Sequence, residues 1–232
     1  MPWNLVLGRG PKYFAIDSLP PFRTVQSGRE ISGASAAFIG LDAPNGDAEA
    51  RRARAAAVKS DLCGALFGTA ISQDVVPIAY FSEFRCPYCR AIERDLDDIM
   101  ATDPDTIRII QHELPIFGPS SELAARASVA AARQGLQQPL RRRFMRTPFL
   151  ADQRSVLAIA SSVGLDTDKL VKDMNSPEVQ AELDRTRALA DVFGFVGTPG
   201  LVVGHTVILG ALPTPLLRRI ITDEHSMPQV AC

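Results

Sequence analysis

Apolar and polar residues along the middle of the chain follow two different periods. A continuous apolar run over residues 75–81 predicts a buried strand. The next stretch repeats apolar residues at helical spacing, with charged residues mostly on the other faces. These apolar positions are Ile92, Leu96, Ile99 and Met100. Residues 106–114 have a β-branched start and predict a second strand. A strand, a helix and a strand of these lengths predict a right-handed parallel βαβ unit.

From about residue 120 to residue 195 the apolar spacing is helical throughout. Capping residues and glycines divide this stretch into several helices. The predicted helices cover about residues 120–132, 140–145, 152–163, 166–173 and 176–193. The stretch therefore predicts a compact helical block, and it contains no internal repeat.

The pattern returns to strands after this block. Apolar runs at residues 201–203 and 206–209 flank a turn that contains Gly204, which predicts a β-hairpin. Residues 213–221 begin with proline and predict a closing helix. Residues 226–232 are expected to form a tail.

Residues 1–68 precede the βαβ pattern and predict an N-terminal extension. Residues 14–16 and 37–41 are expected as short strands, whereas residues 20–23 and 27–35 indicate turns and loop. We interpret the extension as a segment packed on the main domain. A docking or oligomerisation role is the alternative.

One helix is predicted in this extension, over about residues 47–67. Asp47 is expected as its N-cap, and Gly68 follows its end. The helix carries several arginines, which favour a solvated amphipathic face over a binding surface.

The composition argues against several function classes. The formal net charge is −1, so nothing indicates binding to nucleic acid or to an anionic membrane. No apolar run approaches the roughly 20 residues that span a bilayer, so no membrane span is expected. The first residues lack a basic stretch and have only a short apolar run, so no convincing signal peptide is visible.

The candidate chemistry lies between the first predicted strand and the helix after it, in the motif Cys86-Pro87-Tyr88-Cys89. Cys86 falls at the helix N-terminus, where backbone N–H groups and the helix dipole favour its thiolate. Cys89 lies one turn further on, within reach for an intramolecular disulfide. Pro87 lacks an N–H, which costs little in a first helical turn. The motif predicts a catalytic redox pair.

A zinc site is the main alternative for two such cysteines. It would need a second Cys or His pair at ligand spacing, and the other cysteines, Cys63 and Cys232, stand alone in the sequence. We therefore expect no metal and no cofactor. A buried free thiol is the default interpretation of Cys63, and a disulfide with Cys232 stays open. His112 is interpreted as a polar residue at a strand end rather than as an acid or base.

Four sequence features together resemble the DsbA-like thiol–disulfide oxidoreductases. They are FSEFRCPYC at residues 81–89, ELPIFGPSS at 113–121 leading into an alanine-rich helix, VGTP at 196–199, and VVG at 202–204 with Gly210 beyond. Within that family the chain looks closest to the branch of Com1-like and suppressor-of-copper-sensitivity C proteins. The resemblance covers residues 75–221. It implies an α/β thioredoxin fold, βαβ followed by ββα, with an all-helical insertion at about 120–195 and a domain spanning about 69–225.

The resemblance also implies a substrate-binding position. In the family, the residue before a cis proline faces the two cysteines, and its backbone binds an extended substrate segment beside them. These roles map onto Thr198 and Pro199. The sequence alone would not predict the cis bond, since only about 5–6% of X–Pro bonds adopt it.

Two departures from the family concern the tuning of the redox pair. Tyr88 stands where the best-known oxidant of the family has His, and it cannot carry positive charge near neutral pH. Tyr80 stands where the family commonly has a buried Glu. Glu83 matches a frequent acidic position and is expected as a solvated or weakly proton-relaying carboxylate. Pro87, Tyr88 and Glu83 are the predicted redox-tuning residues.

We therefore expect a thiol–disulfide oxidoreductase that acts on protein cysteines and forms or rearranges disulfides in exported proteins. Its partners would be cysteine-containing substrates and a protein that reoxidises or reduces the motif, and a homodimer is one candidate assembly. The family implies a periplasmic location. A glutathione-linked intracellular reductase and a non-catalytic thioredoxin-fold binding module are the alternatives. The sequence does not set the direction of exchange.

Overall fold

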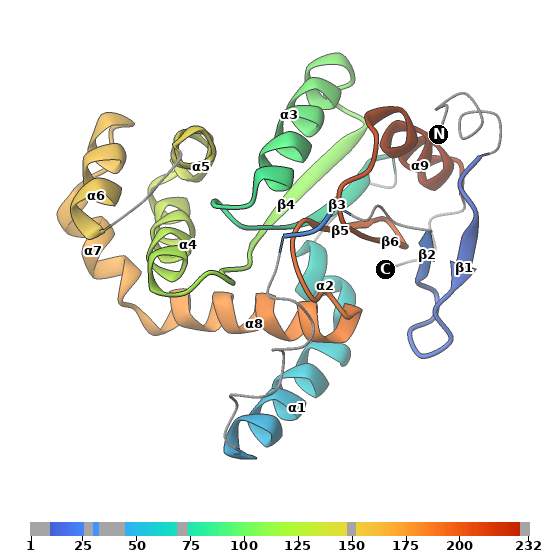
Figure 1. The fold of residues 1–232 in the computed structure, drawn as a ribbon, viewed down its shortest axis with the longest axis horizontal. Coiled ribbons are helices and arrows are strands. Elements are labelled where there is room, and N and C mark those ends of the chain that lie inside the picture. Colours follow the sequence, from blue (N-terminus) through green and yellow to red (C-terminus); the bar gives the residue numbers. More distant parts are fainter. Residues whose placement is uncertain (1–9, 26–29, 33–44, 69–73, 148–151, 228–232) are drawn as a thin grey trace.

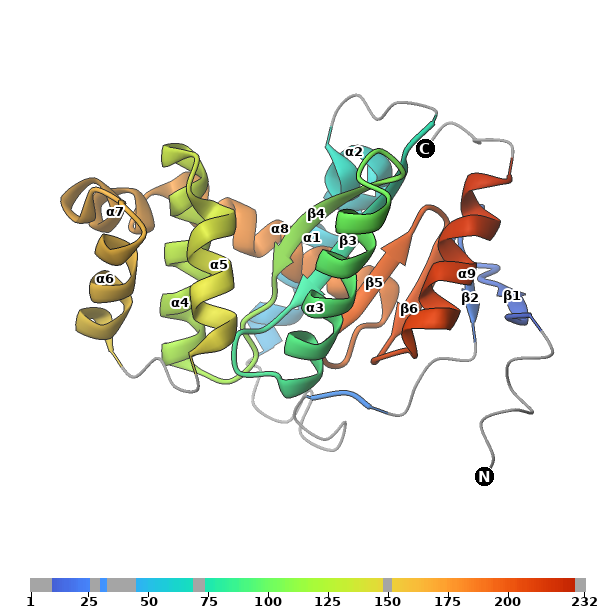
Figure 2. The ribbon, with the colours of Figure 1, turned by 90° about the horizontal axis from the view of Figure 1, so that it is seen from above.

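The computed structural model describes residues 10–25, 30–32, 45–68, 74–147 and 152–227. Within this part of the chain, one mixed sheet has helices on both faces, and a helical block stands beside it (Figures 1 and 2). The strand order is β1-β2-β6-β5-β3-β4. The strands are β1 (Tyr13–Ala15), β2 (Arg23–Val25), β3 (Val76–Ser82), β4 (Ile107–Glu113), β5 (Gly200–Val203) and β6 (Thr206–Leu209).

The predicted βαβ unit lies at one side of this sheet. β3 pairs in parallel with β4, and α3 (Pro87–Thr102) connects the two strands. Every residue of β3 is buried, as expected for a strand covered on both faces. The prediction was wrong at Met100, whose side chain is 39% exposed. The buried side of α3 instead includes a carboxylate, Glu93, which is 8% exposed.

The predicted helical block is present and supplies most of the remaining helices. It comprises α4 (Pro119–Ala131), a 3-10 turn (Ala132–Gln134), α5 (Gln137–Arg146), α6 (Gln153–Ser162), α7 (Thr167–Met174) and α8 (Pro177–Phe193). Asp152, Asp166 and Ser176 accept backbone hydrogen bonds as the N-caps of α6, α7 and α8. In Figure 1, α4 to α7 lie to one side of the sheet, and α8 runs from them back beneath it.

β5 and β6 form the predicted hairpin, and β5 also pairs antiparallel with β3. Gly204 makes the turn with φ 52°, in the left-handed region that favours glycine. The closing helix, α9 (Thr214–His225), extends beyond the predicted end at residue 221. None of the helices in the described ranges is both long and apolar enough to cross a membrane.

The two faces of the sheet carry separate apolar cores. Ile78 and Tyr80 of β3 belong to the core that includes α3 and α9, whereas Ala79 and Phe81 belong to the core that includes α8. This alternation is the two-residue period of a strand. Figure 2 shows α3 and α9 on one side of the sheet and α8 on the other. The end of β3 and the start of α3 are thereby fixed on both sides by packing.

The helix predicted over residues 47–67 is in fact two helices. These are α1 (Asn45–Lys59) and α2 (Leu62–Phe67), and α2 packs under the sheet in the same core as α8. Asp61 separates them, because its side chain accepts the N–H three residues on and caps the second helix. The first helix already begins at Asn45, so Asp47 is not its N-cap.

The N-terminal extension adds two strands to the sheet. β1 confirms the strand expected near residues 14–16, and it pairs antiparallel with β2. β2 was not predicted, and the turn expected over residues 20–23 overlaps its first residue, Arg23. β2 pairs in parallel with β6. The strand expected at residues 37–41 lies outside the described residues.

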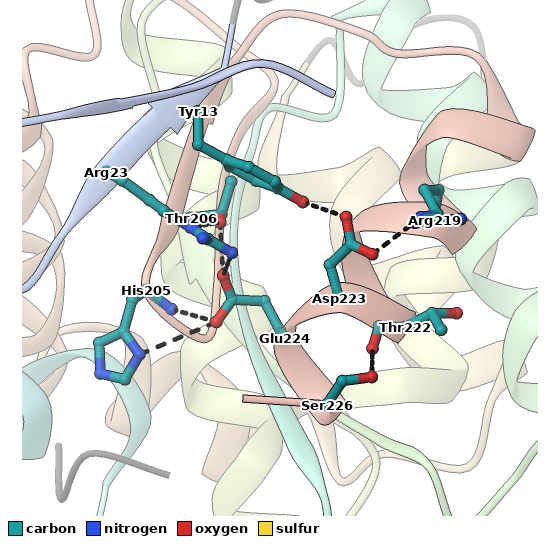
Figure 3. Close-up of polar contacts among 9 residues, drawn as sticks. All are labelled: Tyr13, Arg23, His205, Thr206, Arg219, Thr222, Asp223, Glu224 and Ser226. Carbon is teal, nitrogen blue, oxygen red and sulfur yellow. Dashed lines mark hydrogen bonds and ion pairs between the residues drawn. The ribbon is translucent and has the colours of Figure 1, made fainter. Parts of the chain in front are cut away.

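Polar contacts join these two strands to α9 (Figure 3). The Tyr13 hydroxyl donates to the Asp223 carboxylate at 2.7 Å, and Arg23 forms an ion pair with Glu224 at 2.8 Å. The Arg23 guanidinium also donates to the Thr206 hydroxyl at 3.0 Å. Glu224 is 5% exposed, so its buried charge is balanced by an arginine that comes from the extension.

Candidate active site

Cys86 and Cys89 lie at the junction between β3 and α3. Cys86 is the N-cap of α3, and its sulfur accepts the backbone N–H of Cys89 at 3.1 Å. Both side chains are buried, and neither is in a disulfide. Pro87 occupies the first turn of α3, as predicted, and Tyr88 is partly buried against the core. The structure therefore contains the reduced pair, with Cys86 where helix N–H groups converge.

The pKa values of the two thiols are shifted in opposite directions. A hydrogen bond from the Cys89 side chain lowers the pKa of Cys86 to about 6, with further donors from Ser32, Thr198 and the Cys89 backbone, while burial opposes the shift. Burial raises the pKa of Cys89 well above its usual range, and its bond to Cys86 raises it further. At neutral pH the pair thus carries one thiolate, at Cys86, and one thiol, at Cys89.

Thr198 faces this pair from the loop before β5. The Cys86 sulfur lies 3.5 Å from the Thr198 carbonyl oxygen, and the peptide bond between Thr198 and Pro199 is cis. The Thr198 hydroxyl is buried and has no geometrically formed hydrogen bond in the described part of the chain. It does, however, lower the pKa of Cys86, because a hydroxyl that lacks another acceptor can donate to a thiolate. The structure brings together the two cysteines, Thr198 and Pro199 as expected.

Glu83 is 2% exposed, so the prediction of a solvated carboxylate was wrong, whereas the alternative of a weakly proton-relaying carboxylate stays a prediction. One carboxylate oxygen accepts the backbone N–H of Arg85 at 3.1 Å, and the other accepts the backbone N–H of Ile116 at 3.1 Å. Burial raises the pKa of Glu83 despite these bonds. The carboxylate therefore joins the loop before Cys86 to the loop after β4.

Tyr80 occupies the position where the family commonly has a buried Glu. Its side chain is completely buried, and its hydroxyl donates to the Cys89 carbonyl oxygen at 2.8 Å. Burial raises the pKa of Tyr80 well above its usual range, so the phenol stays neutral. A neutral donor to the helix backbone thus replaces a titratable carboxyl.

Behind this tyrosine lies a buried ionic cluster that the sequence analysis missed. Arg141 of α5 is completely buried and donates to Ser82 at 3.1 Å and to Glu93 at 3.0 Å. It also forms an ion pair with Glu113, whose carboxylate accepts the Ser128 hydroxyl at 2.6 Å. The cluster connects β3, β4 and α3 with the helical block.

The charged residues of this cluster shift one another's pKa values. Burial raises the pKa of Glu93, although Arg141 opposes that shift. Burial works against the charge on Arg141, but Glu113 and Glu93 raise its pKa above the usual range. The sequence signal was weak, because Arg141 opens a run of three arginines, which usually indicates a solvated face.

Three further predictions concern residues away from Cys86. His112 is a buried structural residue, as interpreted: it stacks on Phe81 with ring centroids 4.6 Å apart, and Nε2–H donates to the Leu66 carbonyl at 2.8 Å. Burial lowers its pKa to about 4. Cys63 is disulfide-bonded, so the default of a free thiol was wrong. Cys232 lies outside the described residues.

Ser32 is a second residue that the sequence analysis missed. It lies in the stretch over residues 27–35 that was predicted as loop, yet its backbone pairs with Thr198 in an isolated β-bridge. Its side chain is one of the groups that lower the pKa of Cys86. Nothing in the local sequence places Ser32 there, because the contact joins segments far apart in the chain.

Comparisons with known proteins agree with this arrangement. A profile of the family described as DSBA-like thioredoxin domain matches residues 77–222. The structure of a thioredoxin-like oxidoreductase from Silicibacter pomeroyi DSS-3 is similar with a TM-score of 0.66 and 32% identity, over 72% of this chain and 99% of that one. The catalytic domain of Proteus mirabilis ScsC gives 0.63 and 24%, over 75% and 99%.

Two other similarities show less about this chain, one because its sequence identity is low and the other because it covers little of the relative. A periplasmic thioredoxin-like protein from Salmonella enterica serovar Typhimurium is similar with a TM-score of 0.61 and 22% identity, over 71% of this chain and 95% of that one. At such identities the likeness shows the fold. A Na+/H+ antiporter NhaA of Herminiimonas arsenicoxydans is 31% identical over 123 residues, which are 53% of this chain and 20% of that protein. The chain therefore spans about a fifth of that curated relative.

Proposed function

The chain belongs to the DSBA-like thioredoxin domain family and is an oxidoreductase of that family, and from this premise we propose that it exchanges disulfides with protein cysteines through Cys86 and Cys89. The catalytic unit is assigned to residues 69–225. The observation that carries the proposal is the position of Cys86 at the N-cap of α3, where its sulfur accepts the Cys89 N–H at 3.1 Å and lies 3.5 Å from the Thr198 carbonyl oxygen. The opposite pKa shifts of Cys86 and Cys89 agree with it. One sulfur is a nucleophile and leaving group near neutral pH, and the other is a protonated resolving thiol.

In the oxidising direction, a substrate thiolate attacks the Cys86 sulfur of the disulfide form. The bond between Cys86 and Cys89 breaks, and the Cys89 sulfur leaves with the electron pair and takes up a proton. A second substrate thiolate then attacks the substrate sulfur of the mixed disulfide, which releases Cys86 as a thiolate. Two electrons pass from the substrate dithiol to the motif, and a redox partner must remove them.

The low pKa of Cys86 favours this direction over reduction. A stabilised thiolate stabilises the reduced form, which makes the disulfide form a stronger oxidant. The donors to Cys86 are neutral groups, namely the Cys89 thiol, the Ser32 and Thr198 hydroxyls and a backbone N–H. They stabilise the thiolate without a cationic side chain at position 88, where a tyrosine stands. Pro87 and Glu83 are proposed to tune the pair by fixing the loop and the first helical turn.

We place the protein in an oxidising compartment, with exported proteins as substrates and the periplasm as the site of action. The disulfide at Cys63 supports this location, since structural disulfides persist mainly in oxidising compartments.

Two further proposals concern the family branch and the assembly. We propose that the chain belongs to the branch of Com1-like and suppressor-of-copper-sensitivity C proteins, and that it forms a homodimer. Light scattering of the purified chain tests the assembly.

The decisive experiment is the reduction potential of the Cys86–Cys89 pair, measured by equilibration against glutathione buffers. We expect a value well above the roughly −270 mV of thioredoxin. A value near that of thioredoxin would contradict disulfide donation and favour the glutathione-linked reductase. Cys86→Ser should abolish exchange with a cysteine-containing peptide, and Cys89→Ser should accumulate a mixed disulfide at Cys86. Retained exchange by Cys86→Ser would overturn the proposal as a whole.

A further inference from the structure

A short piece of the N-terminal extension lies across the loop that faces the active cysteines. The Ser32 N–H donates to the Thr198 carbonyl at 2.7 Å, and the Thr198 N–H donates to the Ser32 carbonyl at 2.8 Å. The bridge is antiparallel. A third backbone bond joins the segment to the stretch after β6, where the Ala211 N–H donates to the Glu30 carbonyl at 3.0 Å. Residues 30–32, seen in blue between two grey stretches in Figure 2, are therefore held by backbone hydrogen bonds to two segments, one of which contains Thr198 beside Cys86.

This pairing uses both backbone groups that Thr198 can offer. A residue has one N–H donor and one C=O acceptor on the main chain, and Ser32 occupies both. An extended peptide that adds as a strand needs the same two groups, because strand addition works through main-chain hydrogen bonds. A substrate peptide and residues 30–32 therefore compete for one position.

The side chain of Ser32 completes the likeness to a bound substrate. It contributes to the low pKa of Cys86, and serine differs from cysteine only by oxygen in place of sulfur. We propose that residues 30–32 of this chain are an intramolecular stand-in for substrate, which pairs with Thr198 beside Cys86 and must be displaced before an extended peptide can react. The proposal rests on the proposed function and adds to it a competitor for the substrate that is part of the same chain.

Residues 30–32 are held by few contacts, so a substrate can displace them. Ile31 is 37% exposed, and Glu30 is also exposed, so the segment buries little apolar surface that would hold it in place. Its described contacts with the site are three backbone hydrogen bonds and the Ser32 side chain. Ser32 cannot form a disulfide, so the segment occupies the site without reacting there. A peptide with side chains that bind elsewhere on the surface can take its place by mass action.

The first experiment tests the placement and needs no turnover. The full chain carrying Ser32→Cys and Cys89→Ser is treated with a small disulfide, which takes up the two electrons that are released. We expect a bond between Cys86 and the new sulfur in most of the monomers, since residue 32 pairs with Thr198, whose carbonyl oxygen lies 3.5 Å from the Cys86 sulfur. Peptide mapping measures it. Ser162→Cys with Cys89→Ser, at an exposed site on α6, is the matched control and should not cross-link within the monomer.

The second experiment tests competition with substrate. Ser32→Pro removes the N–H that donates to Thr198, so kcat/KM for oxidising an extended dithiol peptide should be about fivefold higher than in Ser32→Ala, which loses the same hydroxyl. Ser32→Ala keeps both backbone bonds and should increase peptide turnover less than Ser32→Pro. An unchanged peptide rate, or no cross-link, would overturn the stand-in. Loss of exchange with dithiothreitol in the unmodified chain would instead overturn the proposed function.

Discussion

The Tyr80 hydroxyl donates a 2.8 Å hydrogen bond to the backbone carbonyl of Cys89. It connects the centre of β3 to the first turn of α3, so the strand before the motif holds the helix after it. The tyrosine is completely buried, and water therefore cannot replace its hydroxyl when it is removed. The geometry of the two sulfurs depends on this contact across the turn.

Tyr80→Phe should loosen the first turn of α3. The lost hydrogen bond is worth about 1 kcal/mol, which corresponds to a roughly fivefold faster opening of the turn around Cys89. The rate at which iodoacetamide alkylates Cys89, measured in a Cys86→Ser background, reports this opening. Tyr13→Phe removes another hydroxyl, the one bonded to Asp223 on α9, and should leave the alkylation rate unchanged. Equal rates for both variants would contradict the role of Tyr80.

Thr198→Val should raise the pKa of Cys86 from its value of about 6. Valine keeps the shape of threonine but removes the hydroxyl that donates to the thiolate. The ultraviolet absorbance of the thiolate, followed against pH, gives the pKa directly. Thr186→Val is the matched control, since Thr186 is equally buried but lies beside His112. A pKa that does not move in Thr198→Val would show that the hydroxyl does not reach the sulfur.

The stability of the reduced protein should rise with pH through the neutral range. The pKa of Cys86 falls from 9.0 to about 6 on folding, so the folded state loses its proton before the unfolded state does. The stabilisation is complete above the unfolded pKa and is lost as pH falls through the folded one. Between these values the free energy of unfolding should rise by up to about 1.4 kcal/mol per pH unit.

Urea unfolding at several pH values measures this slope, and Cys86→Ser is the reference. His112 also favours stability at higher pH, because burial lowers its pKa to about 4. Its contribution is present in both proteins and cancels in the difference. A Cys86→Ser protein with the same slope as the unmodified reduced chain would contradict the assignment of the thiolate.

Arg141→Met should destabilise the fold strongly. It leaves the Glu93 and Glu113 carboxylates buried without their cation, and breaking a buried pair in this way costs about 3–5 kcal/mol. The neighbouring Arg142 offers a matched control, because its side chain is 58% exposed and its ion pair with Asp97 spans 3.5 Å. Arg142→Met should cost less than about 1 kcal/mol. Similar urea midpoints for the two variants would contradict the structural role of the cluster.

The parts of the fold with strong local periodicity could be predicted from the sequence. The run before Cys86, the helix after it and the hairpin at Gly204 each carry their own signal, and each was found. The placement of Cys86 and Cys89 in the first turn of a helix could be predicted for the same reason, since it depends on two adjacent elements. Thr198 was placed opposite them only through the family resemblance, because its contact spans more than a hundred residues of chain.

The features that were not predicted have no such local signal in the sequence. Ser32 and Arg141 matter through partners that are remote in the sequence. The stretch around Ser32 was predicted as loop, and the two arginines that follow Arg141 give no sign that it is buried. β2 was missed because a three-residue strand has almost no pattern, and it is specified by pairing with β6. Asp61 was missed as a helix boundary, since the spacing of apolar residues is helical on both sides of it.

The two N-terminal strands also change which part of the sheet is open to other molecules. Without them β6 would present an unpaired row of N–H and C=O groups, which is a template for joining another sheet and for aggregation. With them, the edge on that side is β1, three residues long and too short to template an extended assembly. A shortened chain that begins after Val25 would keep Cys86 and Cys89 but would expose the edge of β6. Its solubility should therefore fall even if its redox chemistry is retained.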